Sequence, residues 1–515
     1  MDLRILKLAF LVTFATTGAA CSGSPSGSEP PKSTPGVRVA GGDQVTDSID
    51  ATPQQALVVQ VTEPNGKPAA GTIVQFEAVV AGTGFDQTPS MWMASVGTDV
   101  FEGFTAATTD AEGRASVRVR MGSHAGAGAV TITVPSYGYS AIAQYTVQPG
   151  AAWAVTATPG DTTLYVGRTV EMRATVADRA GNPRADAVTF AVASGPVTLS
   201  AGKTLTTAAV GRGVVVAQVQ AVADTSYVSV IPEGTIAGFT SDMELYTVNL
   251  DGTGLRLLAQ ASAGRGYFGE MPAAWSADGK SLVYHDSRSD HNRMLYSVDL
   301  ASGIRTLLIA EPDGLISQAW PQRSRDGQWV YFNGQGTWQG AYVGSQLFRV
   351  RSDGTGAERV NTGGAFAISG YASPSPDGSR LAFLTNRDFT SGGLHVLDLA
   401  TGQSTALNIS AATPRWSPNG DLIAYVAMPD GFGFMDNHVV TGFGELRVVR
   451  PDGTGARTVT RTQNLFLPGI GWSPDGKYLI GAGQQGAALT VVDVATGEEV
   501  RIRLPRNLRA PDWRP

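Results

Sequence analysis

Cysteine is nearly absent from this 515-residue sequence, in which Cys21 stands alone. A single thiol excludes an intramolecular disulfide and any metal site built from several cysteines. Charged residues are also scarce, at 16% of the chain against about 25% in average globular domains. The 38 basic and 44 acidic residues leave a formal net charge of −6. The chain therefore lacks the positive field that nucleic-acid binding requires.

Residue patterns that carry catalysis are scarce as well. Histidine occurs five times, and no serine lies in a Gly-x-Ser-x-Gly elbow. One local cluster, "HDSRSDHNR", brings together donor types that divalent metals accept; its members are His285, Asp286, Asp290 and His291. We interpret the segment as a polar loop at a strand end, with a metal site as the alternative. We expect no catalytic residues and no cofactor.

A short apolar stretch, "LAFLVTFATTGAA", follows two basic residues near the N-terminus. It is shorter than the roughly 20 residues that span a bilayer, so it predicts an export signal. The adjoining "GAAC" resembles the lipobox of bacterial lipoproteins, although Gly18 stands where that family has leucine. The resemblance implies residues 1–21 as a signal peptide and lipidation of Cys21. An ordinary secretory signal is the alternative, and in either case we expect an exported protein. With Ser22 rather than Asp after the cysteine, the expected location is the outer membrane, on its periplasmic or cell-surface face.

Two related segments follow a tether. Residues 22–36, "SGSPSGSEPPKSTPG", hold nothing that could bury a core. Short alternating runs over residues 37–150 return over residues 151–234, where "VEMRATVADRAGNPRADAVTFAV" matches "ALVVQVTEPNGKPAAGTIVQFEAV". Such spacing predicts two β-sandwiches. The pattern of Gly66, Pro68, Val74 and Phe76 resembles the bacterial immunoglobulin-like domains of invasin- and intimin-type proteins, which implies rigid spacers without catalytic residues.

A different repeat occupies residues 235–515. "WSADGKSLVY", "SRDGQWVYF", "SPDGSRLAFL", "WSPNGDLIAY" and "GWSPDGKYLI" recur at intervals of 42 to 56 residues, a period typical of four-stranded propeller blades. The first segment lacks this pentapeptide and the final "APDWRP" holds only its start. Together the two fragments predict a sixth blade that closes the ring. The motifs "WSPDG", "DLATG" and "DGTG" resemble the TolB-type six-bladed propeller. The expected fold is therefore all-β, with two sandwiches followed by a closed propeller.

The repeat also predicts what its members do. Ser-Pro-Asp-Gly has the residues of a tight turn, and the repeated tryptophans are expected to pack between blades. A four-stranded meander places these turns on one face and the variable loops between strands two and three on the other. We expect the variable face to bind a partner. Its candidate residues are Trp338, Tyr342, Phe432, Phe434, Met435 and His438.

These patterns predict a non-catalytic cell-envelope lipoprotein. Its propeller, held out by spacers, is expected to bind an envelope or surface protein, or a partner associated with polysaccharide or peptidoglycan. Two alternatives stay open: a propeller hydrolase or lyase with a metal at the channel mouth near His285 and His291, and an adhesin that acts through the immunoglobulin-like domains. Peptidases with similar propellers carry a separate α/β-hydrolase domain, for which we expect no room after the propeller.

Overall fold

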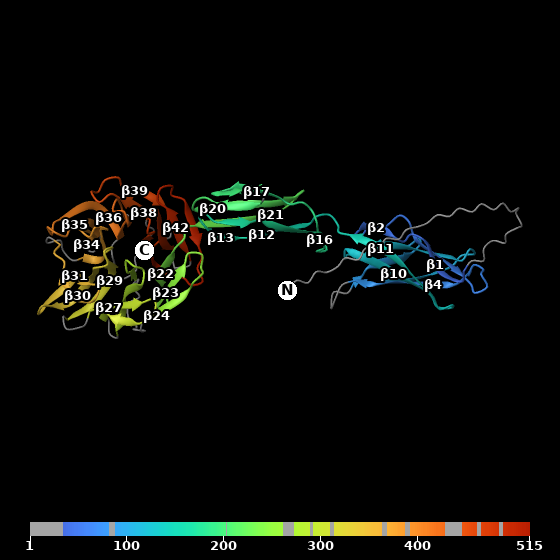
Figure 1. The fold of residues 1–515 in the computed structure, drawn as a ribbon, viewed down its shortest axis with the longest axis horizontal. Coiled ribbons are helices and arrows are strands. Elements are labelled where there is room, and N and C mark those ends of the chain that lie inside the picture. Colours follow the sequence, from blue (N-terminus) through green and yellow to red (C-terminus); the bar gives the residue numbers. More distant parts are fainter. Residues whose placement is uncertain are drawn as a thin grey trace, which may run out of the picture. The chain divides into compact units, whose positions relative to one another are not determined.

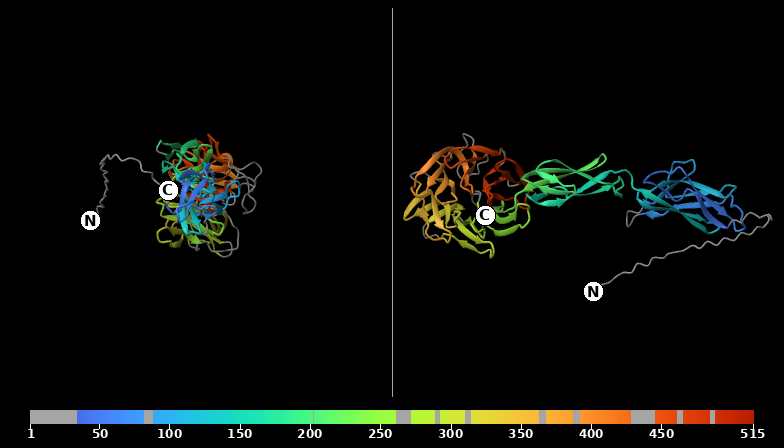
Figure 2. Two further views of the ribbon diagram at one scale, coloured as in Figure 1. Left: turned by 90° about the vertical axis from the view of Figure 1, so that its right-hand side faces the viewer. Right: turned by 45° about the horizontal axis from the view of Figure 1, so that its top comes forward.

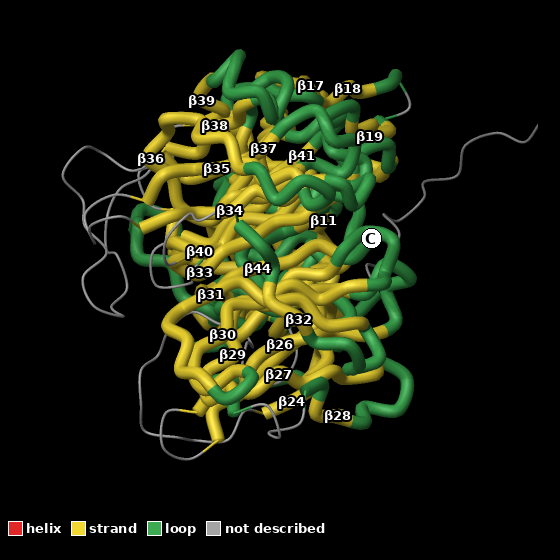
Figure 3. Tube along the Cα trace, turned by 90° about the vertical axis from the view of Figure 1, so that its left-hand side faces the viewer, coloured by secondary structure: helices red, strands yellow, loops and turns green. Residues whose placement is uncertain are grey.

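The structure is a computed structural model. It describes residues 34–81, 88–201, 203–260, 272–288, 292–309, 314–362, 368–386, 392–427, 445–460, 465–483 and 488–515. Every element in this part of the chain is a strand (Figure 1; Figure 3). None of the described residues forms a helix of the length and apolarity that crossing a membrane takes. The chain divides into two compact units.

The first unit comprises the described residues up to Trp153 together with Ala177–Arg184, and is a sandwich of two sheets. One sheet has the order β1 (Gly36–Gly41), β3 (Leu57–Thr62), β9 (Arg114–Met121) and β7 (Met91–Ser95). The other has the order β2 (Val45–Ser48), β11 (Tyr139–Gln148), β10 (Gly126–Val134), β4 (Ile73–Ala78) and β8 (Phe104–Thr108). Two short strands, β5 (Val80–Ala81) and β6 (Thr88–Pro89), pair beside them, and β16 (Pro183–Arg184) completes the unit.

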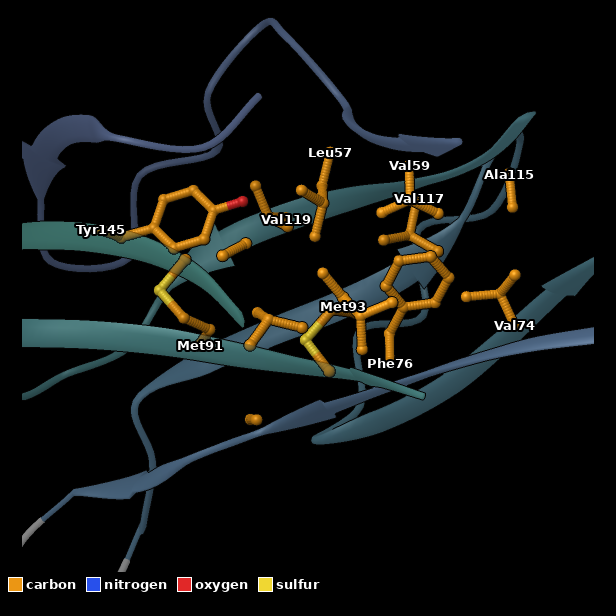
Figure 4. Close-up of a cluster of buried hydrophobic side chains, with 14 of the residues drawn as sticks. Leu57, Val59, Val74, Phe76, Met91, Met93, Ala115, Val117, Val119 and Tyr145 are labelled. Carbon is orange, nitrogen blue, oxygen red and sulfur yellow. The ribbon is translucent and has the colours of Figure 1, made fainter. Parts of the chain in front are cut away.

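The core of the first unit is a layer of aliphatic, methionine and aromatic side chains between the two sheets (Figure 4). The alternation read from the sequence places these side chains inward, because successive strand residues point to opposite faces. On β9, for example, Val117 and Val119 are buried while Ser116 and Arg118 are only partly covered.

The second unit comprises Ala154–Val176 and Ala185–Pro515. It begins with a pair of strands, β12 (Ala154–Thr158) and β15 (Arg173–Ala177). A four-stranded sheet has the order β13 (Thr162–Tyr165), β21 (Val222–Ile231), β20 (Gly211–Val219) and β17 (Thr189–Ser194). A three-stranded sheet has the order β14 (Thr169–Glu171), β19 (Thr204–Thr207) and β18 (Val197–Leu199).

The rest of the second unit consists of four-stranded antiparallel meanders. Their strand orders are β44 (Arg509–Trp513), β22 (Thr235–Phe239), β23 (Glu244–Asn249), β24 (Arg256–Gln260); then β25 (Ala274–Trp275), β26 (Ser281–Arg288), β27 (Asn292–Asp299), β28 (Arg305–Leu307); then β29 (Leu315–Arg323), β30 (Trp329–Trp338), β31 (Ala341–Arg351), β32 (Glu358–Arg359). β33 (Ile368–Pro374), β34 (Arg380–Asn386), β35 (Gly392–Asp398) and the start of β36 (Ser404–Trp416) follow; the end of β36 leads β37 (Ile423–Ala427), β38 (Glu445–Val449) and β39 (Arg457–Thr460). The last meander is β40 (Leu465–Trp472), β41 (Tyr478–Gly483), β42 (Leu489–Asp493) and β43 (Glu499–Ile502).

The inner strand of each meander contacts the inner strand of the next. In order these strands are β44, β25, β29, β33, β36 and β40, and β40 also contacts β44. The C-terminal strand β44 pairs antiparallel with β22, so sequence-distant Ile236 lies opposite Trp513. In Figure 2 the colours of these meanders follow one another around a centre. This arrangement is a β-propeller.

The repeated pentapeptide is a turn, as predicted. In its last copy the Ser473 hydroxyl donates to Asp475 Oδ1 at 2.6 Å and accepts the Tyr478 amide at 2.9 Å. Asp475 also accepts the Lys477 amide at 3.1 Å, and Gly476 takes φ of 70°. The Ser–Asp hydrogen bond recurs at Ser276, Ser324 and Ser375. Local hydrogen bonds therefore account for these serines and aspartates.

The repeated tryptophans are buried between neighbouring meanders, which confirms the packing prediction. Trp275 packs with Phe239 and Leu245 of the preceding sheet, and Trp472 packs with Val426 and Leu446. Apolar inter-sheet contacts of this kind hold the meanders together.

One hydrophobic cluster joins the strands before residue 234 to those after it. Val210 and Ile231 are buried with Leu250 and Ile502, and Tyr165 packs against the same cluster. The expected boundary at residue 234 thus lies inside the second unit, while the division into three domains stays a prediction.

Candidate functional site

The aromatic segment around Trp338 and Tyr342 is a β-hairpin, where the sequence suggested a loop. β30 and β31 continue to the turn Gln339–Gly340, whose φ angles of 48° and 82° fit a two-residue hairpin turn. Ser and Gly around the aromatic residues hid the strand alternation in the sequence. The hairpin lies on the side of the two–three connections, opposite the pentapeptide turns.

The two aromatic side chains of this hairpin differ in exposure. Tyr342 is 68% exposed, and its hydroxyl accepts a hydrogen bond from Gln335 at 2.9 Å. Trp338 packs edge-on against Phe348, with ring centroids 5.1 Å apart, and adjoins the buried cluster of its sheet. Tyr342 is therefore available to a partner, whereas truncating Trp338 also removes packing.

The other four residues of the predicted binding face lie outside the described residues. They are Phe432, Phe434, Met435 and His438. The lipidation candidate Cys21 and the metal candidates Asp290 and His291 also lie outside them.

His285 and Asp286 belong to strand β26, so the expectation of a strand-end loop is wrong at these two positions. Adjacent strand residues point to opposite faces, which prevents the pair from sharing one ion. Asp286 instead pairs with Arg305 at 2.6 Å, and burial lowers the pKa of His285 to about 3, with Arg293 as the second cause. The described residues hold no group of three or more candidate metal ligands.

The inner strands carry a feature that the sequence reading missed. Trp320, Thr413 and Ala510 each precede a proline, and their φ angles are 53°, 47° and 45°. Each lies where the pairing register shifts, so each X-Pro dipeptide is the insertion of a β-bulge. Positive φ is rare for such residues and costs about 1–3 kcal/mol. The signal in the sequence was the recurring dipeptide four residues before the pentapeptide serine position.

Side chains of one inner strand satisfy the open edge of the neighbouring inner strand. Asp512 Oδ2 accepts the Trp275 amide at 3.2 Å, and the Trp275 indole donates to the Asp512 carbonyl at 3.0 Å. In the same way the Ser373 hydroxyl accepts the Trp416 amide at 2.9 Å. Inner-strand amides have no further strand to pair with, so acceptors come from the adjacent sheet.

Buried charge gathers at the same strands. Arg415 is 7% exposed, and its Nε donates to the Ile470 carbonyl at 3.2 Å. Burial lowers the pKa of Arg415, with Asp512 opposing that shift. Burial raises the pKa of Asp512 to about 6, although Arg415 acts in the other direction. Neither residue was among the sequence candidates.

Comparison with known proteins gives partial similarity. No protein-family model matches the chain. An uncharacterized protein of Agrobacterium fabrum is 35% identical over 173 residues, which are 30% of this chain and 53% of that protein. The Tol-Pal system protein TolB of Gluconobacter oxydans is 34% identical over 112 residues, 20% of this chain and 22% of that protein. The chain thus spans about half the length of the first relative and about a fifth of the second.

Among solved structures, TolB from Acinetobacter baumannii is 17% identical, with a TM-score of 0.44, over 65% of this chain and 84% of that chain. The strand order from β22 to β44 and the sequence similarity to TolB agree. This region is a β-propeller, and part of the chain is similar in sequence to TolB.

Proposed function

We propose that the protein is a non-catalytic binding protein of the bacterial cell envelope. In this proposal a lipid on Cys21 anchors the chain, two immunoglobulin-like domains act as spacers, and a closed six-bladed propeller binds an envelope protein or polymer. The sequence similarity to a Tol-Pal system protein and the export pattern at the N-terminus support an envelope location.

The observation that carries the proposal is the unlike character of the two propeller faces. The pentapeptide turns on one face are uniform and internally hydrogen-bonded. The opposite face carries connections of unequal length, and the β30–β31 hairpin presents Tyr342 there at 68% exposure. Tyrosine is enriched at the energetic centres of protein interfaces. The variable face is therefore the proposed binding surface.

A matched pair of substitutions tests this surface. Tyr342→Ala in the full chain should reduce capture of solubilised envelope proteins, or of peptidoglycan sacculi, by about tenfold or more, as for an interface hot spot. Ile304→Ala is the control, because Ile304 is 65% exposed in the turn between β27 and β28, on the opposite face. Equal capture by the wild type and Tyr342→Ala would contradict the assignment.

The anchor has its own test. Cells that express the chain and are fed a labelled fatty acid should label the wild type and leave Cys21→Ser unlabelled, because the thiol is the proposed acylation site. Labelling of Cys21→Ser would show that the lipid, if present, sits elsewhere.

A further inference from the structure

Two arginines flank a pair of aromatic rings, and of these four residues only Arg293 lies off the inner strands. The Cζ atom of Arg293 lies 5.8 Å from the Trp320 ring centroid, and the Cζ atom of Arg415 lies 5.9 Å from the Tyr371 ring centroid. The Trp320 and Tyr371 centroids are 5.6 Å apart. The four residues come from β27, β29, β33 and β36, so the tertiary fold alone brings them together.

Both guanidinium groups also lie within electrostatic reach of one atom. The Tyr371 hydroxyl raises the pKa of Arg293 against the larger effect of burial, and it raises the pKa of Arg415 after the larger effects of burial and of Asp512. Tyr371 is therefore a neighbour that the two arginines share.

The charge of this cluster is incompletely balanced. Arg415 Nη1 is buried and has no hydrogen-bond partner among the described residues. No ion pair joins Arg415 to Asp512 within that same part of the chain. Arginine stays protonated in proteins, and Asp512 acts on Arg415 electrostatically without forming an ion pair with it. A buried guanidinium whose donors are incompletely paired is costly. An anion at Nη1 would remove that cost.

We propose that Arg293, Tyr371 and Arg415 form a binding site for an anionic group, either a carboxylate or a phosphate. The guanidinium donors suit both chemistries, since each presents oxygen acceptors in a plane that an arginine fork matches. The strained bulge at Thr413 turns the chain just before Arg415, and backbone outliers of this kind gather at ligand sites. The site includes neither Tyr342 nor another residue of the β30–β31 hairpin, so either assignment can fail without the other.

The test measures anion-dependent thermal shifts of the full chain. Acetate and inorganic phosphate are titrated separately against chloride at matched ionic strength, and affinity follows from the rise in Tm with concentration. At least one of the two anions should raise Tm above the chloride reference in the wild type. A response to acetate alone assigns a carboxylate site, and a response to phosphate alone assigns a phosphate site. No response to either anion overturns the proposal.

Three variants locate the effect. Arg415→Gln and Arg293→Gln should each weaken affinity about tenfold or more, because each removes a charged donor. Asp512→Asn should tighten it, because it removes the nearby negative charge while an amide oxygen can still accept the Trp275 amide. Arg293→Gln and Asp512→Asn keep the test decisive if buried Arg415 proves necessary for folding. Wild-type affinity in Arg293→Gln overturns the site.

Arg359→Gln is the matched control. Arg359 is exposed on β32 and should leave affinity unchanged. A loss in this control equal to that in Arg293→Gln would show general charge screening, which also overturns the site.

Discussion

The first unit and the propeller differ in how completely their buried polar side chains are hydrogen-bonded. The first unit has an apolar core, and its buried polar side chains are hydrogen-bonded: Tyr145 donates to the Gly42 carbonyl at 2.8 Å, and Asp178 accepts the Gly150 amide at 2.8 Å. Every buried side-chain atom without a partner in the described residues lies in the propeller, between Tyr284 and Arg447. Several of them belong to arginines.

The contrast separates a structural role from a binding role. A sandwich with an apolar core gains its stability from packing. When its buried polar groups are already hydrogen-bonded, it offers a ligand no unpaired buried donor or acceptor. Unsatisfied buried donors and strained bulges cost stability, and native folds retain them mostly at functional sites. The propeller interior is accordingly where we expect ligand chemistry, and the first unit is where we expect mechanical support.

The largest effect is expected in the first unit. Phe76 is fully buried, so Phe76→Ala should destabilise this unit by about 3–5 kcal/mol through lost packing and a cavity. Phe104→Ala is the control, because Phe104 lies opposite Glu77 on the neighbouring strand and is half exposed. Calorimetry should show one transition move in Phe76→Ala, with the anion response of the propeller intact. Loss of that response would break the proposed separation of roles.

The next effect concerns pH in the propeller. Burial raises the pKa of Asp512 from 3.8 to about 6, with Arg415 opposing. The folded state binds the Asp512 proton more tightly than the unfolded state does. The contribution of this proton to the free energy of unfolding is therefore complete below pH 3.8 and disappears as pH rises through about 6. The free energy of unfolding of Asp512→Asn, measured with denaturant, should therefore rise by about 2–3 kcal/mol relative to that of the wild type between pH 4 and pH 7. A difference in unfolding free energy between the two proteins that does not change with pH would contradict a raised pKa of the buried Asp512 carboxyl.

A turn aspartate supplies the control of opposite sign. Hydrogen bonds from Ser375 and then Ser379 lower the pKa of Asp377 to about 2. Its contribution is therefore present above pH 3.8 and is lost as pH falls towards 2. Asp377→Asn should differ most from the wild type at neutral pH and least in acid.

Local and repeated patterns in the sequence predicted much of this structure. Alternation predicted β9 and its inward valines, and the pentapeptide predicted turns whose serine and aspartate bond within five residues. The strand character of His285 was missed because the polar "HDSR" lacks apolar alternation, while its pairing with β27 supplies the order.

The anion site could not be read from the sequence for a different reason. Arg293 and Arg415 meet Trp320 and Tyr371 only after four meanders pack side by side. Bulges at Trp320 and just before Arg415 also affect how these two residues are placed, and in the sequence they appear only as recurring X-Pro pairs. To predict which side chains of neighbouring repeats touch, one must know the register of each strand. The length of the repeat alone does not give that register.

The smallest effects come from one substitution made in both regions. Thr109 is buried in the first unit, where its hydroxyl donates to the Ala69 carbonyl at 2.5 Å and accepts the Thr72 amide at 2.8 Å. Thr109→Val should cost about 1–3 kcal/mol because it leaves both groups unpaired. Thr413 is buried in the propeller with no partner for Oγ1 among the described residues. Thr413→Val removes this unsatisfied hydroxyl, so it should not lower the free energy of unfolding and should raise it by about 1 kcal/mol. Urea unfolding of both variants measures the difference. Equal losses would mean that the Thr413 hydroxyl has a partner in solution, and the contrast between a satisfied sandwich and an unsatisfied propeller would then fail at this position.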